Sequence, residues 1–221
     1  MMAHAGPQHA ELEFPTARGG RVAMKHGFDR AAALAALVFL APLMTVIAIL
    51  IRLDGGPALF RQTRLGAGGL EFDCLKFRSM AVDAEARLAD LLAADPEAAE
   101  HFRIHHKLKH DPRVTLVGRF LRVTSLDELP QLINVLRGEM SLVGPRPMTP
   151  DERAEYGAAF ADYAARRPGI TGLWQVSGRH RLPFSERARL DQTYAREWSL
   201  GLDLKRSEER RVGKECFLLC R

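Results

Sequence analysis

The chain has 221 residues, of which 47% are hydrophobic, 27% are charged and 7% are aromatic. This composition is typical of one folded domain with a real core, and it excludes a chain that is mainly disordered. The net charge of +5 and the sequence pI near 9.4 favour a polyanionic partner, which could be nucleic acid, an anionic membrane surface or a phosphorylated substrate.

The chain begins with a polar segment, which is followed by a long apolar one. Residues 1–27 are polar and rich in Gly and His, and we expect a mobile tail there. Residues 31–51, AAALAALVFLAPLMTVIAILI, carry no charge. At about 1.5 Å per residue they are long enough to cross a bilayer of about 30 Å. The apolar run is too long for a cleavable signal peptide, so a membrane segment is expected.

The topology of this segment depends on Pro42 and on the flanking charges. Pro42 removes one backbone hydrogen bond and predicts a bend. A single span usually has more Lys and Arg on one side, whereas a hairpin that enters and leaves one leaflet has them at both ends. Basic residues flank both ends here: Arg18, Arg21, Lys25 and Arg30 before, and Arg52, Arg61 and Arg64 after. We predict a re-entrant membrane hairpin over 28–52, with a full span or a buried core helix as alternatives.

The remaining chain, 53–205, is predicted to form one compact α/β domain that is mainly helical with a small sheet. A turn at 66–69 precedes FDCLKF, which alternates as a strand does. Periodic segments predict four helices. They are Asp83–Ala94, which stops near Pro96, and Leu129–Leu136, Asp151–Arg166 and Phe184–Trp198.

The end of the chain differs in character from the rest. Residues 206–221 begin RSEERRVGKEC, which closely resembles an in-frame translation of a sequencing-library adapter. We therefore expect a non-native tail there and a natural chain that was interrupted after Lys205. The tail holds five Lys/Arg and three Asp/Glu, so the net charge before it is +3. Cys74 is then the only cysteine, which excludes a disulfide framework and fits a reducing compartment.

The segment SLDE, Ser125 to Glu128, permits two interpretations. S-x-x-E is a capping box, in which Ser125 and Glu128 only satisfy free amides at a helix start. Pro130 would then fall at the fifth helical position and remove a hydrogen bond. If Pro130 instead opens the helix, Asp127 and Glu128 lie in the turn before it, near the positive end of the helix dipole. They could then supply a nucleophile and a metal ligand.

Three other basic segments could bind anions. Arg146 lies between two prolines that stiffen the backbone and fix where its fork of donors points, although a solvated surface turn has the same pattern. The basic run 103–122 lacks the interleaved aromatic residues of nucleic-acid binders, so we expect lipid headgroups or a pyrophosphate as its partner and no nucleic acid. The loop 168–179 ends in Arg179, a further candidate anion contact, or is a structural turn around Trp174.

These motifs together resemble those of a known family. KFRSM (76–80), the long segment 106–147 and RPGITGLWQVSGR (167–179) are similar to the bacterial sugar transferases, the monotopic phosphoglycosyl transferases. The resemblance runs from Phe28 to Lys205. It implies transfer of a sugar 1-phosphate from a UDP-sugar to a polyprenyl phosphate, namely undecaprenyl phosphate, at the cytoplasmic face of the bacterial inner membrane.

The resemblance also implies roles for single residues. Asp127 would be the nucleophile, and Glu128 with Asp127 would hold Mg²⁺. Arg122 and Arg146 would contact phosphate. The family's membrane helix breaks at a proline that often follows a serine; Pro42 follows Ala41 here, so that serine is missing. Further substrate contacts would come from the other two motifs, at Lys76, Arg78 and Arg179.

The short chain looks most like the exopolysaccharide-initiating members, which implies UDP-glucose or UDP-galactose as donor. Membrane lipid surrounds such a protein, and downstream glycosyltransferases are possible partners. The alternative is a non-catalytic membrane-associated scaffold of a polysaccharide assembly complex.

Overall fold

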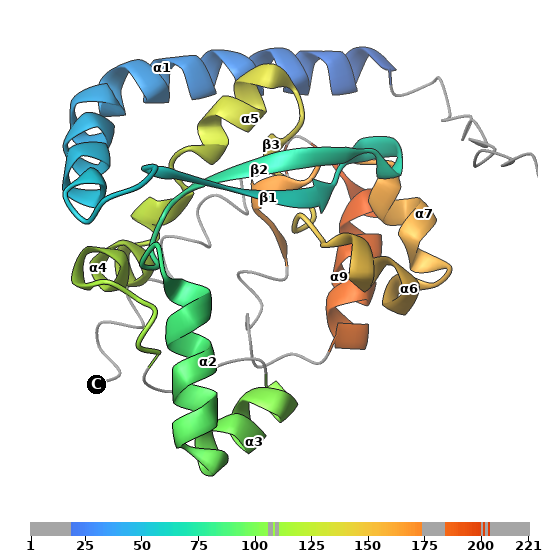
Figure 1. Cartoon of the computed structure of the whole chain (residues 1–221). Coiled ribbons are helices and arrows are strands. Elements are labelled where there is room, and N and C mark those ends of the chain that lie inside the picture. The colour runs from blue at the N-terminus through green and yellow to red at the C-terminus, as the bar shows by residue number, and fades with distance from the viewer. Residues whose placement is uncertain are drawn as a thin grey trace, which may run out of the picture.

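The computed structural model describes residues 19–105, 108, 111–173, 184–199, 201 and 203. This part is mainly helical with two small sheets, as predicted (Figure 1). Its elements are α1 (Gly19–Arg52), β1 (Leu59–Leu65), η2 (Ala67–Gly69), β2 (Glu71–Phe77), α2 (Ala84–Ala94), α3 (Pro96–His105), α4 (Leu116–Thr124), η3 (Leu126–Glu128), α5 (Gln131–Arg137), β3 (Ser141–Val143), η4 (Pro150–Glu152), α6 (Arg153–Tyr156), α7 (Ala159–Ala164), β4 (Gly169–Thr171) and α9 (Phe184–Glu197).

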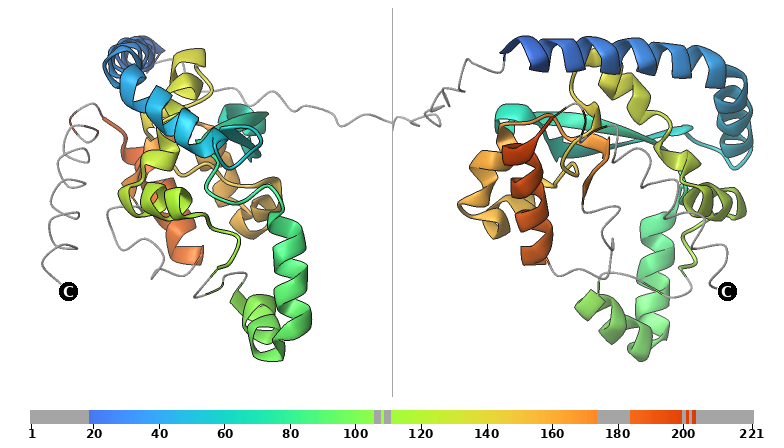
Figure 2. Two further views of the ribbon diagram at one scale, coloured as in Figure 1. Left: turned by 60° about the vertical axis from the view of Figure 1, so that its left-hand side comes forward. Right: turned by 180° about the vertical axis from the view of Figure 1, so that it is seen from behind.

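Helix α1 is long and bent. It runs along the top of the domain and turns sharply downward in its lighter-blue C-terminal part (Figure 1), as the view from behind also shows (Figure 2). Pro42 lies inside the helix and cannot donate to the carbonyl of Val38. The hydroxyl of Thr45 donates to the carbonyl oxygen of Ala41 at 2.8 Å, a bond of the kind that bends helices. Thr45 thus contributes a side-chain hydroxyl beside Ala41, the position where serine is missing.

The start of α1 corrects the predicted tail. The helix begins at Gly19, so residues 19–27, assigned to a mobile lead, are helical. Glycines at 19, 20 and 27 weaken the local helix signal. The helix forms there because Lys25 and Asp29 are buried against the rest of the domain, and such packing outweighs local propensity.

Both parts of α1 pack against the domain. Ala33 contacts the core residues Cys74, Leu132 and Val135 of β2 and α5. The later part packs Ile47 and its neighbours against α4 and the end of β2. Among the described helices, α1 alone is long and apolar enough to cross a membrane, and only 11% of its most apolar 18-residue stretch is buried. That small fraction disfavours the alternative of a buried core helix.

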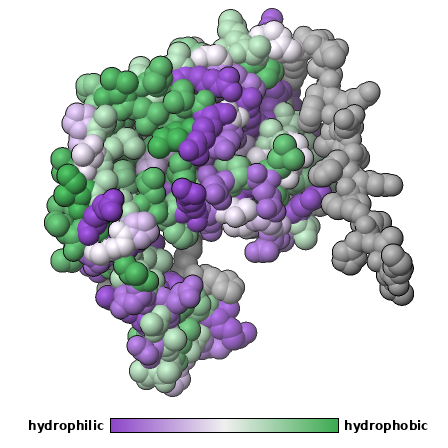
Figure 3. Space-filling model, turned by 45° about the horizontal axis from the view of Figure 1, so that its top comes forward, coloured by the Kyte–Doolittle hydropathy of each residue, from purple (hydrophilic) through white to green (hydrophobic). Residues whose placement is uncertain are grey.

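The outer face of α1 is apolar and exposed. Figure 3 shows hydrophobic side chains gathered on one side of the molecule, over the bent helix and its neighbours. Phe39 is 82% exposed, and α4 adds Leu116 at 84%. The exposed apolar surface comprises Leu34, Val38, Phe39, Val46, Ile49, Leu50 and Leu53 of α1 and Leu116, Phe120 and Val123 of α4. A patch of this kind marks contact with a membrane or another protein.

Two small sheets form the centre of the domain. Strands β1 and β2 pair antiparallel from Leu59↔Phe77 to Leu65↔Glu71. Strands β3 and β4 pair parallel through Ser141↔Gly169 and Val143↔Thr171. Strand β2 was predicted from the sequence, whereas β1, β3 and β4 were not.

The helices follow the predictions in part. Helices α2, α5 and α9 lie within a few residues of the predicted segments. Residues 151–166 form the short elements η4, α6 and α7 instead of one helix, because the chain turns at Gly157 with φ of 50°. Helix α2 ends at Ala94, close before Pro96, as predicted; Pro96 then stands at the first position of α3, where proline is tolerated.

A buried polar cluster, which we call the Lys25 cluster, joins the two ends of the described chain. Lys25 Nζ lies 2.7 Å from the Asp203 carboxylate and 3.5 Å from that of Asp29. Ser141 Oγ donates to Asp29 at 2.6 Å. Two aromatic side chains also donate hydrogen bonds to the Asp203 carboxylate, Tyr194 Oη at 2.8 Å and Trp198 Nε1 at 3.0 Å. Every charged group in this cluster therefore has a partner of opposite charge or a hydrogen-bond donor.

Candidate active site

The predicted carboxylate pair lies in a short turn between α4 and α5. Asp127 and Glu128 belong to the 3₁₀ turn η3. Ser125 has φ of 59°, in the left-handed region, and its side chain makes no capping hydrogen bond. Pro130 is the N-cap residue of α5. The capping-box interpretation is therefore wrong, and the alternative in which proline opens the next helix is confirmed.

Strand β2 brings a lysine to this turn. Lys76 Nζ lies 2.9 Å from Glu128 Oε1, and the two side chains are 27% and 28% exposed. The position of Lys76 is set by Asn134 of α5, whose side chain is fully buried. Asn134 Oδ1 accepts from the N–H of Leu75 at 3.0 Å, and its Nδ2 donates to the carbonyl of Asp73 at 2.7 Å. These bonds hold β2 against α5, so the position of Lys76 relative to η3 is fixed.

Asp127 is half-buried and lies close to two cations. Burial raises the pKa of the Asp127 carboxyl above its ordinary value, and Glu128 raises it further, whereas Lys76 and Arg122 lower it. Burial is the largest of these effects. No side chain in the described part of the chain donates a hydrogen bond to Asp127. A carboxylate held this way is poorly solvated and faces a positive field, which are properties of a nucleophile that attacks an anionic group.

Helix α4 positions Arg122. Its Nε donates to Ser79 Oγ at 2.8 Å, close after the strand that carries Lys76. Helix α4 approaches this segment closely, because a Cβ at Gly118 would collide with the backbone carbonyl of Ser79. Thr115 caps the helix by accepting from the N–H of Gly118 at 2.9 Å. The last turn of α4 is thereby held beside the carboxylate pair.

Arg146 follows β3 and is half-buried between its two prolines. Its charge, with that of Lys76, lowers the pKa of the Cys74 thiol, while burial, the largest effect, raises it. Glu128 also raises the pKa of this thiol. Lys76, Glu128 and Arg146 therefore all act electrostatically on the same thiol of β2.

Arg78, which was predicted to contact phosphate, is bound through one guanidinium nitrogen to the end of α1. Its Nη2 donates to the carbonyl of Ile51 at 3.0 Å and to that of Gly55, and it lies 3.6 Å from the Asp54 carboxylate. The side chain is 9% exposed. The last carbonyls of a helix have no partner within the helix, and Arg78 supplies one at the end of α1. Arg179, the other residue predicted from a separate motif, lies outside the described residues.

Comparison with known proteins decides the family. Residues 20–207 match the family model described as Bacterial sugar transferase. The chain belongs to the bacterial sugar transferase family. The undecaprenyl-phosphate galactose phosphotransferase of Salmonella typhimurium is 46% identical over 181 residues, which cover 82% of this chain and 38% of that protein. The exopolysaccharide production protein ExoY of Rhizobium meliloti is 46% identical over 181 residues, which cover 81% and 80%.

A third relative has a fuller name. The UDP-glucose:undecaprenyl-phosphate glucose-1-phosphate transferase of Caulobacter vibrioides is 46% identical over 184 residues, which cover 79% of this chain and 63% of that protein. The chain thus spans about two fifths of the Salmonella relative and most of the Rhizobium one.

Two residues that position the site in this sugar transferase were missed by sequence reasoning. Asn134 is an amide inside the otherwise apolar run LINVL, and a buried polar residue in a helix is a signal for a specific partner. Ser79 lies in KFRSM and holds Arg122. Its motif was recognised, but the contact between two segments far apart in the sequence was not.

The carboxylates suit a magnesium ion that also binds substrate. The described residues contain no group of three or more His, Cys, Asp or Glu that could hold a metal ion by themselves. Mg²⁺ is commonly bound by one or two carboxylates together with substrate phosphates. Asp127 and Glu128 supply such a pair, and Lys76 lies 2.9 Å from Glu128 Oε1.

Proposed function

We propose that this protein transfers a hexose 1-phosphate from a UDP-sugar to undecaprenyl phosphate through a covalent intermediate on Asp127. The observation that carries the proposal is the geometry of η3, where a half-buried carboxylate faces Lys76 and Arg122. A nucleophilic role explains why a carboxylate is kept near two cations and receives no hydrogen bond from any side chain among the described residues.

The reaction has two steps. A carboxylate oxygen of Asp127 attacks the β-phosphorus of the UDP-sugar, and the bond from that phosphorus to the bridging oxygen breaks, which releases UMP. The phosphate oxygen of the lipid acceptor then attacks the same phosphorus, and the bond to Asp127 breaks, which restores the carboxylate and gives the lipid diphosphate sugar. Each step forms and breaks one P–O bond, so two dissimilar substrates use one site in turn.

The basic residues offset the repulsion between anions. Lys76, Arg122 and Arg146 would orient the pyrophosphate and stabilise the charge that develops on it. Mg²⁺, held by Glu128 and Asp127 with the substrate phosphates, would supply further charge neutralisation. Burial that raises the pKa of Asp127 keeps it basic enough to attack, while Lys76 keeps it ionised.

The substrates are inferred from the relatives. The names of the Salmonella and Caulobacter proteins specify undecaprenyl phosphate, with galactose in one and glucose in the other. We propose undecaprenyl phosphate as the acceptor and UDP-glucose or UDP-galactose as the donor. The product would begin an exopolysaccharide or another surface glycan, which downstream glycosyltransferases extend.

The surface of the molecule supports attachment to one leaflet. The exposed apolar face of the bent α1 continues into that of α4, and an open hollow of about 390 Å³ lies between them beside Leu50, Met80 and Leu116. We propose that α1 enters the cytoplasmic leaflet of the inner membrane and returns from it, with Pro42 at the turn. Because α4 bears both Arg122 and this apolar face, the site would lie at the interface where a soluble donor and a lipid acceptor meet.

The test is to detect the intermediate. The purified protein is incubated with Mg²⁺ and UDP-glucose or UDP-galactose but without acceptor, and its intact mass and the released UMP are measured. We expect a mass increase of one hexose phosphate, matched by UMP, which disappears when undecaprenyl phosphate is added. Asp127→Asn should give neither the adduct nor UMP.

Transfer at the wild-type rate by Asp127→Asn would overturn the proposed mechanism. Absence of UMP release with every UDP-sugar from a folded wild-type protein would instead favour the non-catalytic scaffold.

A further inference from the structure

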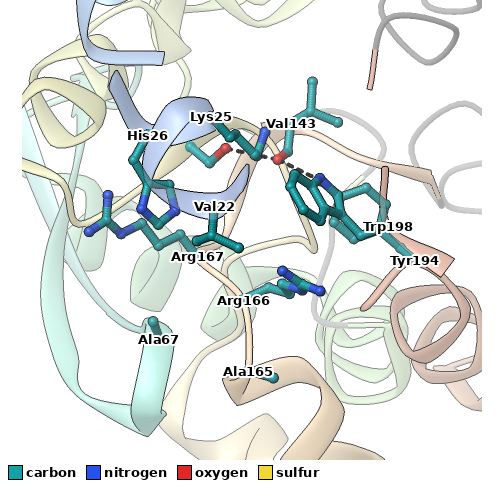
Figure 4. Close-up of a pocket in the computed structure, with 11 residues that line it drawn as sticks. Val22, Lys25, His26, Ala67, Val143, Ala165, Arg166, Arg167, Tyr194 and Trp198 are labelled. Carbon is teal, nitrogen blue, oxygen red and sulfur yellow. Dashed lines mark hydrogen bonds between the residues drawn. The ribbon is translucent and has the colours of Figure 1, made fainter. Parts of the chain in front are cut away.

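A second basic site lies at the far end of the domain from η3. A cavity of about 220 Å³ opens where the first turns of α1 meet η2, β3, the segment between α7 and β4, and α9 (Figure 4). Pockets for drug-sized ligands measure about 300–1,000 Å³, so this cavity suits a single small group. The polar and aromatic side chains that line it include Lys25, His26, Arg166, Arg167, Tyr194 and Trp198.

Arg167 is a half-buried cation without a hydrogen-bond or ion-pair partner among the described residues. Arg30 lies beside it, because a Cβ at Gly138 would collide with Arg30 Nη2 and lie 3.5 Å from Arg167 Nη1. Burial lowers the pKa of Arg167, and Arg30 lowers it further, while Asp29 acts weakly in the opposite direction. The two neighbouring guanidinium groups therefore repel each other in a partly desolvated place.

The nearby carboxylates already bind other groups of the protein. Asp29 and Asp203 receive Lys25 and the donors of the Lys25 cluster described above. Arg166 stacks over Trp198 at 4.8 Å and donates to the carbonyl of Ala195.

The same local excess of positive charge acts on His26. This residue precedes the apolar segment of α1. Burial lowers the pKa of its imidazole to about 4, and the cations Arg167, Lys25, Arg30 and Arg166 contribute in the same direction. The cavity is thus a positive site in which His26 is neutral and able to donate or accept a hydrogen bond.

We propose that this cavity binds a phosphate group, held by Arg167 together with His26, which lies beside it (Figure 4). The group would belong either to a free phosphate or to a membrane lipid headgroup. A planar guanidinium with free donors in a partly closed site is well suited to phosphate oxygens. A bound anion would also relieve the repulsion between Arg167 and Arg30.

This site is separate from the one proposed for catalysis. The cavity includes Ala67 at the turn of the β1–β2 hairpin, whereas Lys76 pairs with Phe60 near the other end. From Glu71 to Lys76 the strand advances about 17 Å at about 3.3 Å per residue. A nucleotide sugar with its β-phosphorus at Asp127 would not fill both sites, so the inference is independent of the proposed function.

The test compares Arg167→Gln with wild type. Melting temperature is measured in a maltoside detergent, which contains no phosphate, during titration with inorganic phosphate against sodium chloride at equal ionic strength. A saturable rise of roughly 5 °C is expected for wild type at a large excess over Kd. Arg167→Gln should lose that rise but, without phosphate, melt no lower than wild type, because the substitution removes a repulsion.

The control is Arg103→Gln on α3, which removes the same charge from a side chain that is 71% exposed and pairs only locally with Glu100. It should respond to phosphate as wild type does. The η3 site is intact in all three proteins, so stabilisation through that site would persist in Arg167→Gln.

The second arm identifies the source of the phosphate. If inorganic phosphate has no effect, the proteins are placed in nanodiscs of phosphatidylglycerol, and a wild-type advantage over Arg167→Gln that is absent in maltoside would assign a lipid headgroup. Equal responses of wild type and Arg167→Gln in both arms would overturn the proposal. A constant loss of stability in Arg167→Gln, independent of phosphate and lipid, would also overturn it and assign Arg167 a structural role.

Discussion

The Lys25 cluster and the η3 site both join a lysine to two carboxylates, and they differ in how fully those carboxylates are satisfied. In the Lys25 cluster, Asp29 and Asp203 receive donors from a serine, a tyrosine and a tryptophan besides the lysine. At η3, Glu128 has Lys76, and Asp127 has no side-chain donor in the described part. The first arrangement holds the fold together, whereas the second leaves charge and bonding capacity for a ligand.

Removing Lys25 should have the largest effect on stability. Lys25→Met would leave two carboxylates buried without their cation, and breaking a buried pair this way destabilises by about 3–5 kcal/mol. Denaturation in detergent would measure the loss. Lys76→Met is the matched control, because that lysine is 27% exposed and its pair contributes about 1 kcal/mol or less. If the two variants were equally stable, the distinction between the two clusters would fail.

Lys76→Met should instead reduce catalysis. Loss of one cation next to the developing phosphate charge should slow UMP release by on the order of 10²-fold. Lys76 also lowers the pKa of Asp127, so without it that pKa rises further. Activity, which needs the ionised carboxylate, should then be lost at a higher pH as the solution is acidified.

Rates of UMP release across a pH series would measure both effects of Lys76→Met. Lys76→Arg, which keeps the charge, should stay close to wild type in the position of the acid limb. An unchanged acid limb in Lys76→Met would argue against an electrostatic effect of Lys76 on Asp127.

The smallest expected effect is that of Asp127→Asn on stability. The pKa of Asp127 is raised on folding, so its contribution favours the folded state at low pH and declines as pH rises through the folded-state value. Asparagine removes that decline. The variant should therefore unfold at the same or a slightly higher denaturant concentration than wild type at neutral pH, although it is inactive. A clear loss of stability would show that Asp127 has a structural partner.

Sequence patterns predicted the parts of the fold that depend on local signals. Strand β2 and helices α2 and α9 have clear periodicity. Because Asp127 and Glu128 come just before Pro130, the sequence also indicated a turn there ahead of α5. Helix α4 was missed because the segment was interpreted by its basic charge alone; its apolar side chains lie partly in the core, at Val117 and Leu121, and partly on the surface, at Leu116, Phe120 and Val123. Strands β3 and β4 have three residues each, too few to give a period.

The site was predictable in its residue types but not in all of its contacts. Asp127, Glu128 and Arg122 stand close together in the sequence, and the motif predicted a role for each of them. The pairing of Lys76 with Glu128 depends on the register set by Asn134, which joins residues about 60 positions apart. The assignment of Arg78 to the end of α1 depends on the path of a helix that ends before β1, and no local pattern records it.

The way α1 wraps the domain limits how the protein can be divided. Its inner face supplies Ala33 to the core at α5 and both Ile47 and Ile51 to the core at α4. A fragment that starts after Arg52 would lack the α1 side chains that pack in each of these cores. Arg78 would also lose its hydrogen bond to the carbonyl of Ile51. Helix α1 is therefore part of the scaffold, so a shortened version without it, made for crystallisation or inhibitor screening, would not preserve the η3 site.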